Sequence, residues 1–84
     1  MGEVRIRMPD SGVIVDYASQ AERDRSVRLA RERQALAQRG CLLPGWDELT
    51  EAEREMTSLE ARNWLRAAVL AGLAEPEPER EGGQ

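Results

Sequence analysis

The stretch VRIRMPDSGVIVDY, residues 4–17, alternates apolar and polar side chains, turns at Pro-Asp-Ser-Gly, and then continues as a second apolar run. Alternation with a period of two indicates a half-buried strand, and the four turn residues are typical of a tight connection. If Met8 pairs with Val13, Arg5 falls opposite Asp16 on one face, a favourable cross-strand pair. The other face is then wholly apolar and consists of Val4, Ile6, Met8, Val13, Val15 and Tyr17. The sequence therefore predicts an antiparallel β-hairpin over residues 3–17.

The next segment predicts a helix over residues 20–39. Ser19 and Glu22 have the spacing of a capping box, and Gly40 is a favourable residue just beyond a helix end. The apolar stripe of this helix is weak, because its only large members are Val27, Leu29 and Leu36. We therefore expect a largely solvated helix that buries one narrow side.

Residues 48–73 predict two further helices. Thr50 precedes Glu53 by three residues, and Thr57 precedes Glu60 by three. Near Thr57 the apolar residues also shift to a different face of the helical repeat. Since each Thr-x-x-Glu is a capping-box signature, we expect helices over 48–56 and 58–73 with a break at Thr57. A single kinked helix is the alternative interpretation.

The hairpin needs a cover, because a two-stranded ribbon is marginal in water. The best candidate is the stripe of the last predicted helix that is centred on Trp64, with Leu65 and Val69 beside it. Under this expectation Trp64 anchors the core, and Trp64→Ala costs about 3–5 kcal/mol.

A hairpin followed by three helices predicts the α+β class. The length of 84 residues limits the chain to a single small domain, over residues 1–74. Residues 75–84 are rich in Glu, Pro and Gly, so we expect a disordered acidic tail. Aromatic residues make up only 4% of the chain, which predicts a thin core that a partner or self-association would supplement.

Several function classes are excluded by missing residue types. There is no His, only one Cys and no Gly-rich phosphate loop, so we expect no enzyme, catalytic residue, cofactor, metal site or small-molecule substrate. Cys41 is interpreted as a small buried hydrophobic residue. Without a membrane-length apolar run or a signal peptide, the expected location is cytoplasmic.

The last predicted helix has apolar residues on two sides, a pattern typical of a helix packed on both. Trp46, in a Pro-Gly loop, is either a staple against the following helix or an exposed anchor. The predicted partner surface consists of Trp46, Leu59, Arg62, Arg66, Leu70 and Leu73. We therefore expect a small non-enzymatic protein–protein interaction module of bacterial or phage type: an adaptor, inhibitor or assembly factor. Its partner would be another protein, or a second copy in a homodimer.

A nucleic-acid function is the alternative. The segment VRIRMPD, residues 4–10, resembles the opening strand of ribbon-helix-helix DNA-binding proteins, in which the strands of a dimer enter the major groove. The resemblance implies base-reading roles for Arg5 and Arg7, but Gly12 and the β-branched residues after it disfavour the helix that should follow. Arginines also share a broad face of the 20–39 helix, namely Arg25, Arg28, Arg31 and Arg39. A dimeric DNA-binding regulator, such as an antitoxin or small repressor, remains the second hypothesis. The net charge of −4 and the acids among these arginines favour a solvated face.

Overall fold

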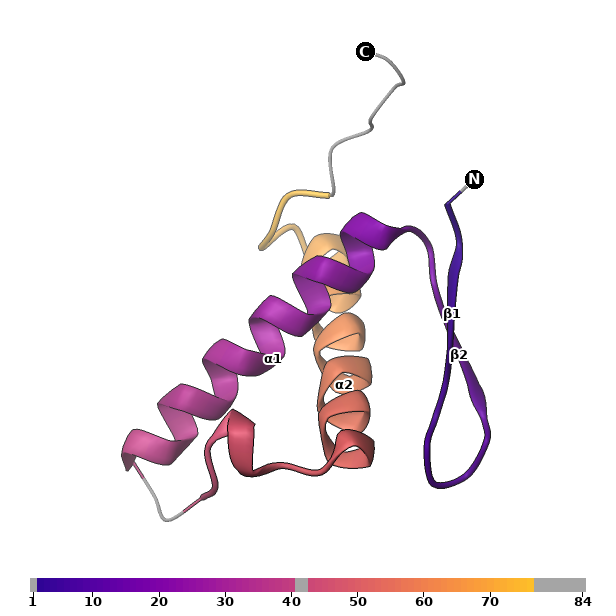
Figure 1. Cartoon of the computed structure of the whole chain (residues 1–84). Coiled ribbons are helices and arrows are strands. Elements are labelled where there is room, and N and C mark those ends of the chain that lie inside the picture. Colours follow the sequence, from indigo (N-terminus) through magenta and orange to yellow (C-terminus); the bar gives the residue numbers. More distant parts are fainter. Residues whose placement is uncertain (1, 41–42, 77–84) are drawn as a thin grey trace.

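The computed structural model describes residues 2–40 and 43–76 and has the predicted α+β class. Strands β1 (Val4–Arg7) and β2 (Ile14–Tyr17) form a hairpin, and two α-helices follow, α1 (Gln20–Gly40) and α2 (Glu51–Leu70). A 3-10 turn, η1 (Trp46–Glu48), lies between the helices. Figure 1 shows the hairpin beside α2, with the C-terminal end of α1 on the far side of the molecule. The predictions for Cys41 and for residues 77–84 of the tail lie outside the described residues.

The hairpin has the predicted register. Val4 pairs with Tyr17, Arg5 with Asp16 and Ile6 with Val15, and the Met8 N–H donates to the Val13 carbonyl over 2.8 Å. Gly12, with a φ of +76°, supplies the left-handed residue that closes the loop. The placement of Val13 on the buried face is wrong, since 57% of its surface is exposed. It lies at the mouth of the turn, outside the paired strand residues.

Helix α1 confirms the predicted span within one residue. At its start the Glu22 N–H donates to Ser19 Oγ over 3.0 Å, and the Glu22 carboxylate accepts from the Ala18 N–H over 2.7 Å. The Ser19 side chain therefore caps the Glu22 amide as the sequence predicts, while the Glu22 carboxylate accepts from Ala18, one residue before the expected cap.

The hairpin does not continue as the ribbon-helix-helix resemblance implies. In that family a helix follows the opening strand, whereas here the strand β2 follows the Pro9 turn.

The predicted break at Thr57 is wrong, because α2 is one continuous helix. Thr50 forms the predicted capping box with Glu53. Thr57, by contrast, lies inside the helix, where its Oγ1 donates to the Glu53 carbonyl over 2.8 Å. The Thr57 hydroxyl is thus hydrogen-bonded within α2 and does not cap a second helix.

The end of α2 also differs from the prediction, since the helix stops at Leu70 and does not reach residue 73. Gly72 adopts a φ of +77°, and its N–H donates to the Val69 carbonyl. The Leu73 N–H donates to the Ala68 carbonyl over 2.8 Å. These two bonds form a Schellman motif, which explains why a glycine terminates the helix here.

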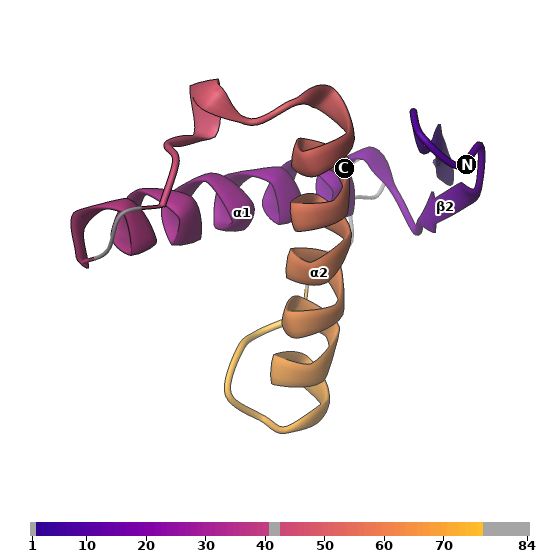
Figure 2. The same cartoon turned by 90° about the horizontal axis from the view of Figure 1, so that it is seen from below.

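The two helices pack through small side chains. Ser26 and Ala30 of α1, and Ser58 and Ala61 of α2, are all buried. Figure 2 shows α2 crossing α1, with the C-terminal half of α2 projecting beyond the crossing. Residues this small let two helix backbones approach closely, so the crossing uses little apolar volume.

The hairpin is covered by Leu59, and the prediction that Trp64 covers it is wrong. Leu59 packs against the cluster of Met8, Val15 and Tyr17, whereas Trp64 is 70% exposed. In an uninterrupted α2, Ser58 and Ala61 face α1 while Leu59 faces the strands. Trp64 then falls on neither buried side.

Tyr17 links the three parts of the fold. Its side chain is only 1% exposed, and the guanidinium carbons of Arg23 and Arg62 lie 5.2 and 5.7 Å from its ring centroid. Arg23 also donates to the Tyr17 hydroxyl over 3.3 Å and to both carboxylate oxygens of Glu55, over 2.7 and 2.8 Å. The small core therefore combines apolar contacts with one largely buried ion pair between α1 and α2.

Candidate partner-binding surface

The most exposed large apolar side chains of the described residues lie on the C-terminal half of α2 and just after it. Leu70 is 88% exposed, Leu73 83% and Trp64 70%. Trp64 and Leu70 belong to the C-terminal half of α2, which projects beyond the helix crossing, and Leu73 follows the end of the helix (Figure 2). Leu70 and Leu73, together with the half-buried Leu65 and Val69, form what we term the helix-end surface. Trp64 lies about 120° around the helix from Leu70 and is not part of this surface. Such grouped exposure of large apolar side chains is typical of an interaction site.

A groove opens within this surface, between the first turns of α1 and the last turns of α2. Its volume is about 340 Å³. The apolar lining comes from Leu65, Val69, Leu70 and Pro76, and the polar rim comes from Glu22, Arg25 and Arg66. An apolar side chain of a partner fits this combination of lining and rim.

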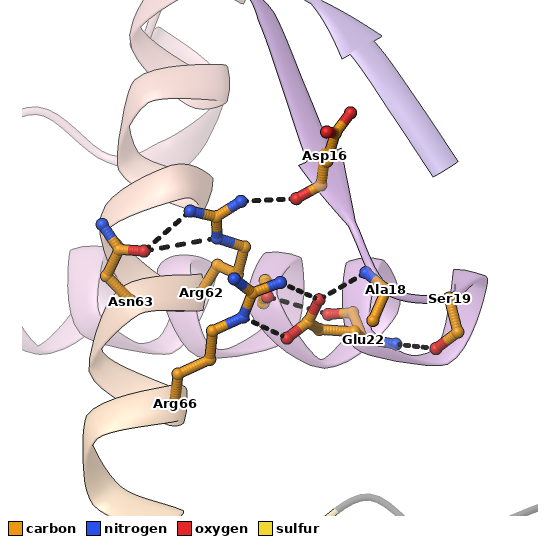
Figure 3. A network of polar contacts seen from close by, with 8 residues as sticks. Asp16, Ala18, Ser19, Glu22, Arg62, Asn63 and Arg66 are labelled. Atoms are coloured by element: carbon orange, nitrogen blue, oxygen red, sulfur yellow. Dashed lines mark hydrogen bonds and ion pairs between the residues drawn. The ribbon is translucent and has the colours of Figure 1, made fainter. Parts of the chain in front are cut away.

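The wall of the groove is held by a bidentate ion pair. Arg66 Nε and Nη2 each donate to one carboxylate oxygen of Glu22 over 2.8 Å, and the Ala18 N–H donates to the same carboxylate (Figure 3). The hydrogen bonds from Arg66 lower the pKa of Glu22, against the opposing effect of burial. The pKa of Arg66 is raised in turn by the same hydrogen bonds. Glu22 therefore contributes to the cap of α1 and also fixes the position of α2 through Arg66.

Arg62 makes its hydrogen bonds to other groups of the same chain. One of its Nη atoms donates to the Asp16 carbonyl of β2, and Nε and the other Nη donate to Asn63 Oδ1 over 3.3 and 2.9 Å (Figure 3). Its guanidinium also lies over the Tyr17 ring. Arg62 thus joins α2 to the hairpin, and a partner would have to compete with these contacts.

The structure separates the residues predicted for the partner surface. Leu70 and Leu73 are exposed at the end of α2, whereas Leu59 packs against the hairpin. Trp46 is half-buried in η1, where its carbonyl accepts from Arg54 Nε over 3.0 Å and its ring lies 5.7 Å from the Arg54 guanidinium carbon. Trp46 therefore packs against α2 near its start, away from Leu70 (Figure 1).

Trp64 was missed as a surface residue. Its apolar neighbours on one stripe of the helix predict a buried position, which its 70% exposure contradicts. A signal was present in the small size of Ala61 and Ala68, since small residues suit a close helix crossing better than Trp does.

The arginines of the nucleic-acid hypothesis do not form one surface. Arg5 and Arg7 lie on the hairpin, while Arg39 lies at the opposite end of the molecule, on the last turn of α1 (Figure 1). Arg5 Nε is 3.5 Å from the Asp16 carboxylate, and Arg7 donates to the Gly12 carbonyl over 3.5 Å. Arg25 donates to the Glu75 carbonyl over 3.4 Å. Arg28 and Arg31 are exposed, and no ion pair engages them within the part of the chain that the structure describes.

Among residues 2–40 and 43–76, no group of three or more His, Cys, Asp or Glu side chains could hold a metal ion. Neither of the helices in these ranges is long and apolar enough to cross a membrane. No family model matches the chain, and no curated protein or solved structure is significantly similar to it.

Proposed function

We propose that this chain is a small non-enzymatic interaction module that binds a protein partner through the helix-end surface. The observation that carries the proposal is Leu70, which is almost fully exposed yet lines the groove. Leaving a leucine in water forfeits about 1.5–3 kcal/mol of burial, which a partner would recover.

The groove suggests how a partner binds. Its apolar lining accepts an apolar anchor side chain, and Arg25 and the Arg66–Glu22 pair at the rim offer polar contacts around it. A buried apolar anchor inside a polar rim is the usual anatomy of a binding hot spot. An adaptor, inhibitor or assembly factor needs no more than such a surface.

The test compares two leucine substitutions. The tagged full-length chain captures its partner from the native host, and the partner is then purified and titrated against each variant by calorimetry. Leu70→Glu should weaken binding by at least about 2 kcal/mol, as expected for a hot-spot residue. The control is Leu36→Glu, which also replaces an exposed leucine, 62% exposed on α1. Equal affinity for both variants would reject the helix-end surface.

A DNA-binding regulator is the second candidate, supported by the exposed Arg28 and Arg31 on α1. Binding of a labelled duplex should then weaken linearly on a log–log plot as salt rises, and Arg28→Ala should reduce the slope by about one. We expect no such binding at physiological salt, because the basic residues are dispersed and the net charge is −4.

A further inference from the structure

One edge of the hairpin carries backbone groups that point away from the molecule. In an antiparallel ribbon, hydrogen-bonded and non-hydrogen-bonded residue pairs alternate. The Met8 N–H donates to the Val13 carbonyl, so Ile6–Val15 and Val4–Tyr17 are the next bonded pairs along the ribbon. It follows that the N–H and C=O groups of Arg5 and Arg7 point outward from β1.

The edge formed by β2 differs from the edge formed by β1. The Asp16 carbonyl, which points outward from β2, accepts a hydrogen bond from Arg62 of α2 (Figure 3). No hydrogen bond engages the outward N–H of Arg5 or Arg7 within the described residues. An open edge of this kind is a template for pairing with another chain.

Burial across the ribbon points to the same edge. On the apolar face, Val15 and Tyr17 of β2 are buried, whereas Val4 and Ile6 of β1 are only partly buried. The apolar side chains of β2 on this face are therefore shielded from solvent, and those of β1 are shielded only in part. A further strand beside β1 would remove the remaining apolar surface of Val4 and Ile6 from water.

We propose that β1 is a dimerisation edge at which a second copy of this chain pairs antiparallel, strand β1 against strand β1. The product is a continuous four-stranded sheet with the two β1 strands at its centre. The register that uses the whole strand places the two-fold axis at Arg5. Val4 of one copy then opposes Ile6 of the other on the apolar face, and Glu3 opposes Arg7 on the outer face.

The charges of β1 favour a second copy as the occupant. By symmetry, the Glu3–Arg7 opposition occurs twice, and each is a favourable cross-strand pair. The single like-charge opposition is Arg5 against Arg5, and each of these arginines already has acidic neighbours: its guanidinium is 3.5 Å from Asp16 and 3.9 Å from Glu3. The strand is thus complementary to itself. This inference does not use the helix-end surface and stands apart from the proposed function.

The first test removes one backbone donor from the edge. Arg5→Pro deletes the outward N–H and leaves the pairing with β2 intact, since that N–H is not part of the hairpin ladder. Arg5→Thr is the matched control, because it removes the same charge and keeps the N–H. By sedimentation equilibrium, the dimer dissociation constant of Arg5→Pro should rise roughly 30-fold or more, from two lost bonds per dimer. Arg5→Thr should dimerise at least as tightly as the wild type, and far-UV circular dichroism checks that both variants fold.

The second test does not depend on how proline is tolerated. In a Cys41→Ser background, Arg5→Cys should form a disulfide-linked dimer under mild oxidation, because opposed residues of a bonded pair have Cα atoms about 5.5 Å apart. Ser11→Cys, exposed on the hairpin loop, should not. Two results would overturn the proposal: a wild-type monomer at all concentrations up to high micromolar, or a dimer that Arg5→Pro and Arg5→Thr affect equally.

Discussion

At the scale of single residues, the fold depends on a few arginines that reach between elements. Arg23 bridges Tyr17 and Glu55, Arg62 reaches the strand carbonyl of Asp16, and Arg66 reaches Glu22. Each of these long side chains links two elements by polar contacts outside the small apolar core. Arginine suits this role because its guanidinium donates in a fork and also stacks on an aromatic ring.

The Arg23–Glu55 pair should be a main contributor to stability. Both side chains are largely buried, with 17% and 15% of their surface exposed. Glu55→Ala should lower the free energy of unfolding by about 3 kcal/mol, because it leaves Arg23 as an uncompensated charge. Urea denaturation measures this, with Glu60→Ala on the exposed side of α2 as the control. The double variant Arg23→Met/Glu55→Met should be more stable than Glu55→Ala. A Glu55→Ala midpoint equal to that of the control would contradict a structural role for the pair.

The Glu22 carboxylate should make stability depend on acid pH. Its pKa in the folded state is lowered from the ordinary value of a glutamate, chiefly through the hydrogen bonds from Arg66. A lowered folded-state pKa contributes stability above the unfolded-state pKa, and this contribution is lost as pH falls through the folded-state value. Urea midpoints measured from pH 7 to pH 3 should therefore fall less steeply for Glu22→Gln than for the wild type. Glu60→Gln should retain the wild-type profile, and a Glu22→Gln curve that parallels it would contradict this role.

At the scale of elements, α2 is defined by what lies on each of its sides. Ser58 and Ala61 face α1 and Leu59 faces the hairpin, while Leu70, about three turns further along the same side as Leu59, is exposed. The crossing with α1 should tolerate no added volume. Ala61→Leu should lower the free energy of unfolding by about 1–3 kcal/mol through overpacking. Ala67→Leu, exposed on the same helix, should change it by less than about 0.5 kcal/mol. Equal stability of the two variants by thermal denaturation would show that the crossing is looser than the burial of Ala61 indicates.

Local sequence signals predicted the hairpin register and α1 because the interactions behind them are local. Strand alternation places Arg5 opposite Asp16, and Ser19 caps the segment that follows it directly. The break at Thr57 was wrong for the same reason: a Thr-x-x-Glu pattern has the same spacing inside a helix as at its start. Whether it caps depends on the residues before it, which here already belong to the helix that Thr50 caps.

The candidate site was predicted only in part. Leu70 and Leu73 are exposed as expected, but Leu59 is not free, and Arg62 and Arg66 are engaged within the chain. A helix with apolar residues on several sides does not show which side meets which neighbour. That choice is made by contacts between distant segments, here the small residues at the helix crossing.

At the scale of the whole molecule, the open edge of β1 and the helix-end surface lie on different elements. We therefore propose separate sites for a protein partner and for a second copy. Dimerisation would also stabilise the fold by mass action, since the folded state alone presents the edge.

Amide hydrogen exchange followed by NMR should reveal this edge directly. In a monomer the outward N–H groups of Arg5 and Arg7 face water and should exchange rapidly. In the dimer they should bond to the opposing β1 strand and become protected as protein concentration rises. The N–H of Ile14, which points outward from β2 opposite Arg7, is the internal control and should exchange rapidly at every concentration. Protection of Ile14 without protection of Arg5 would place the dimer contact on β2, and rapid exchange at all three positions would leave the hairpin edge without a partner.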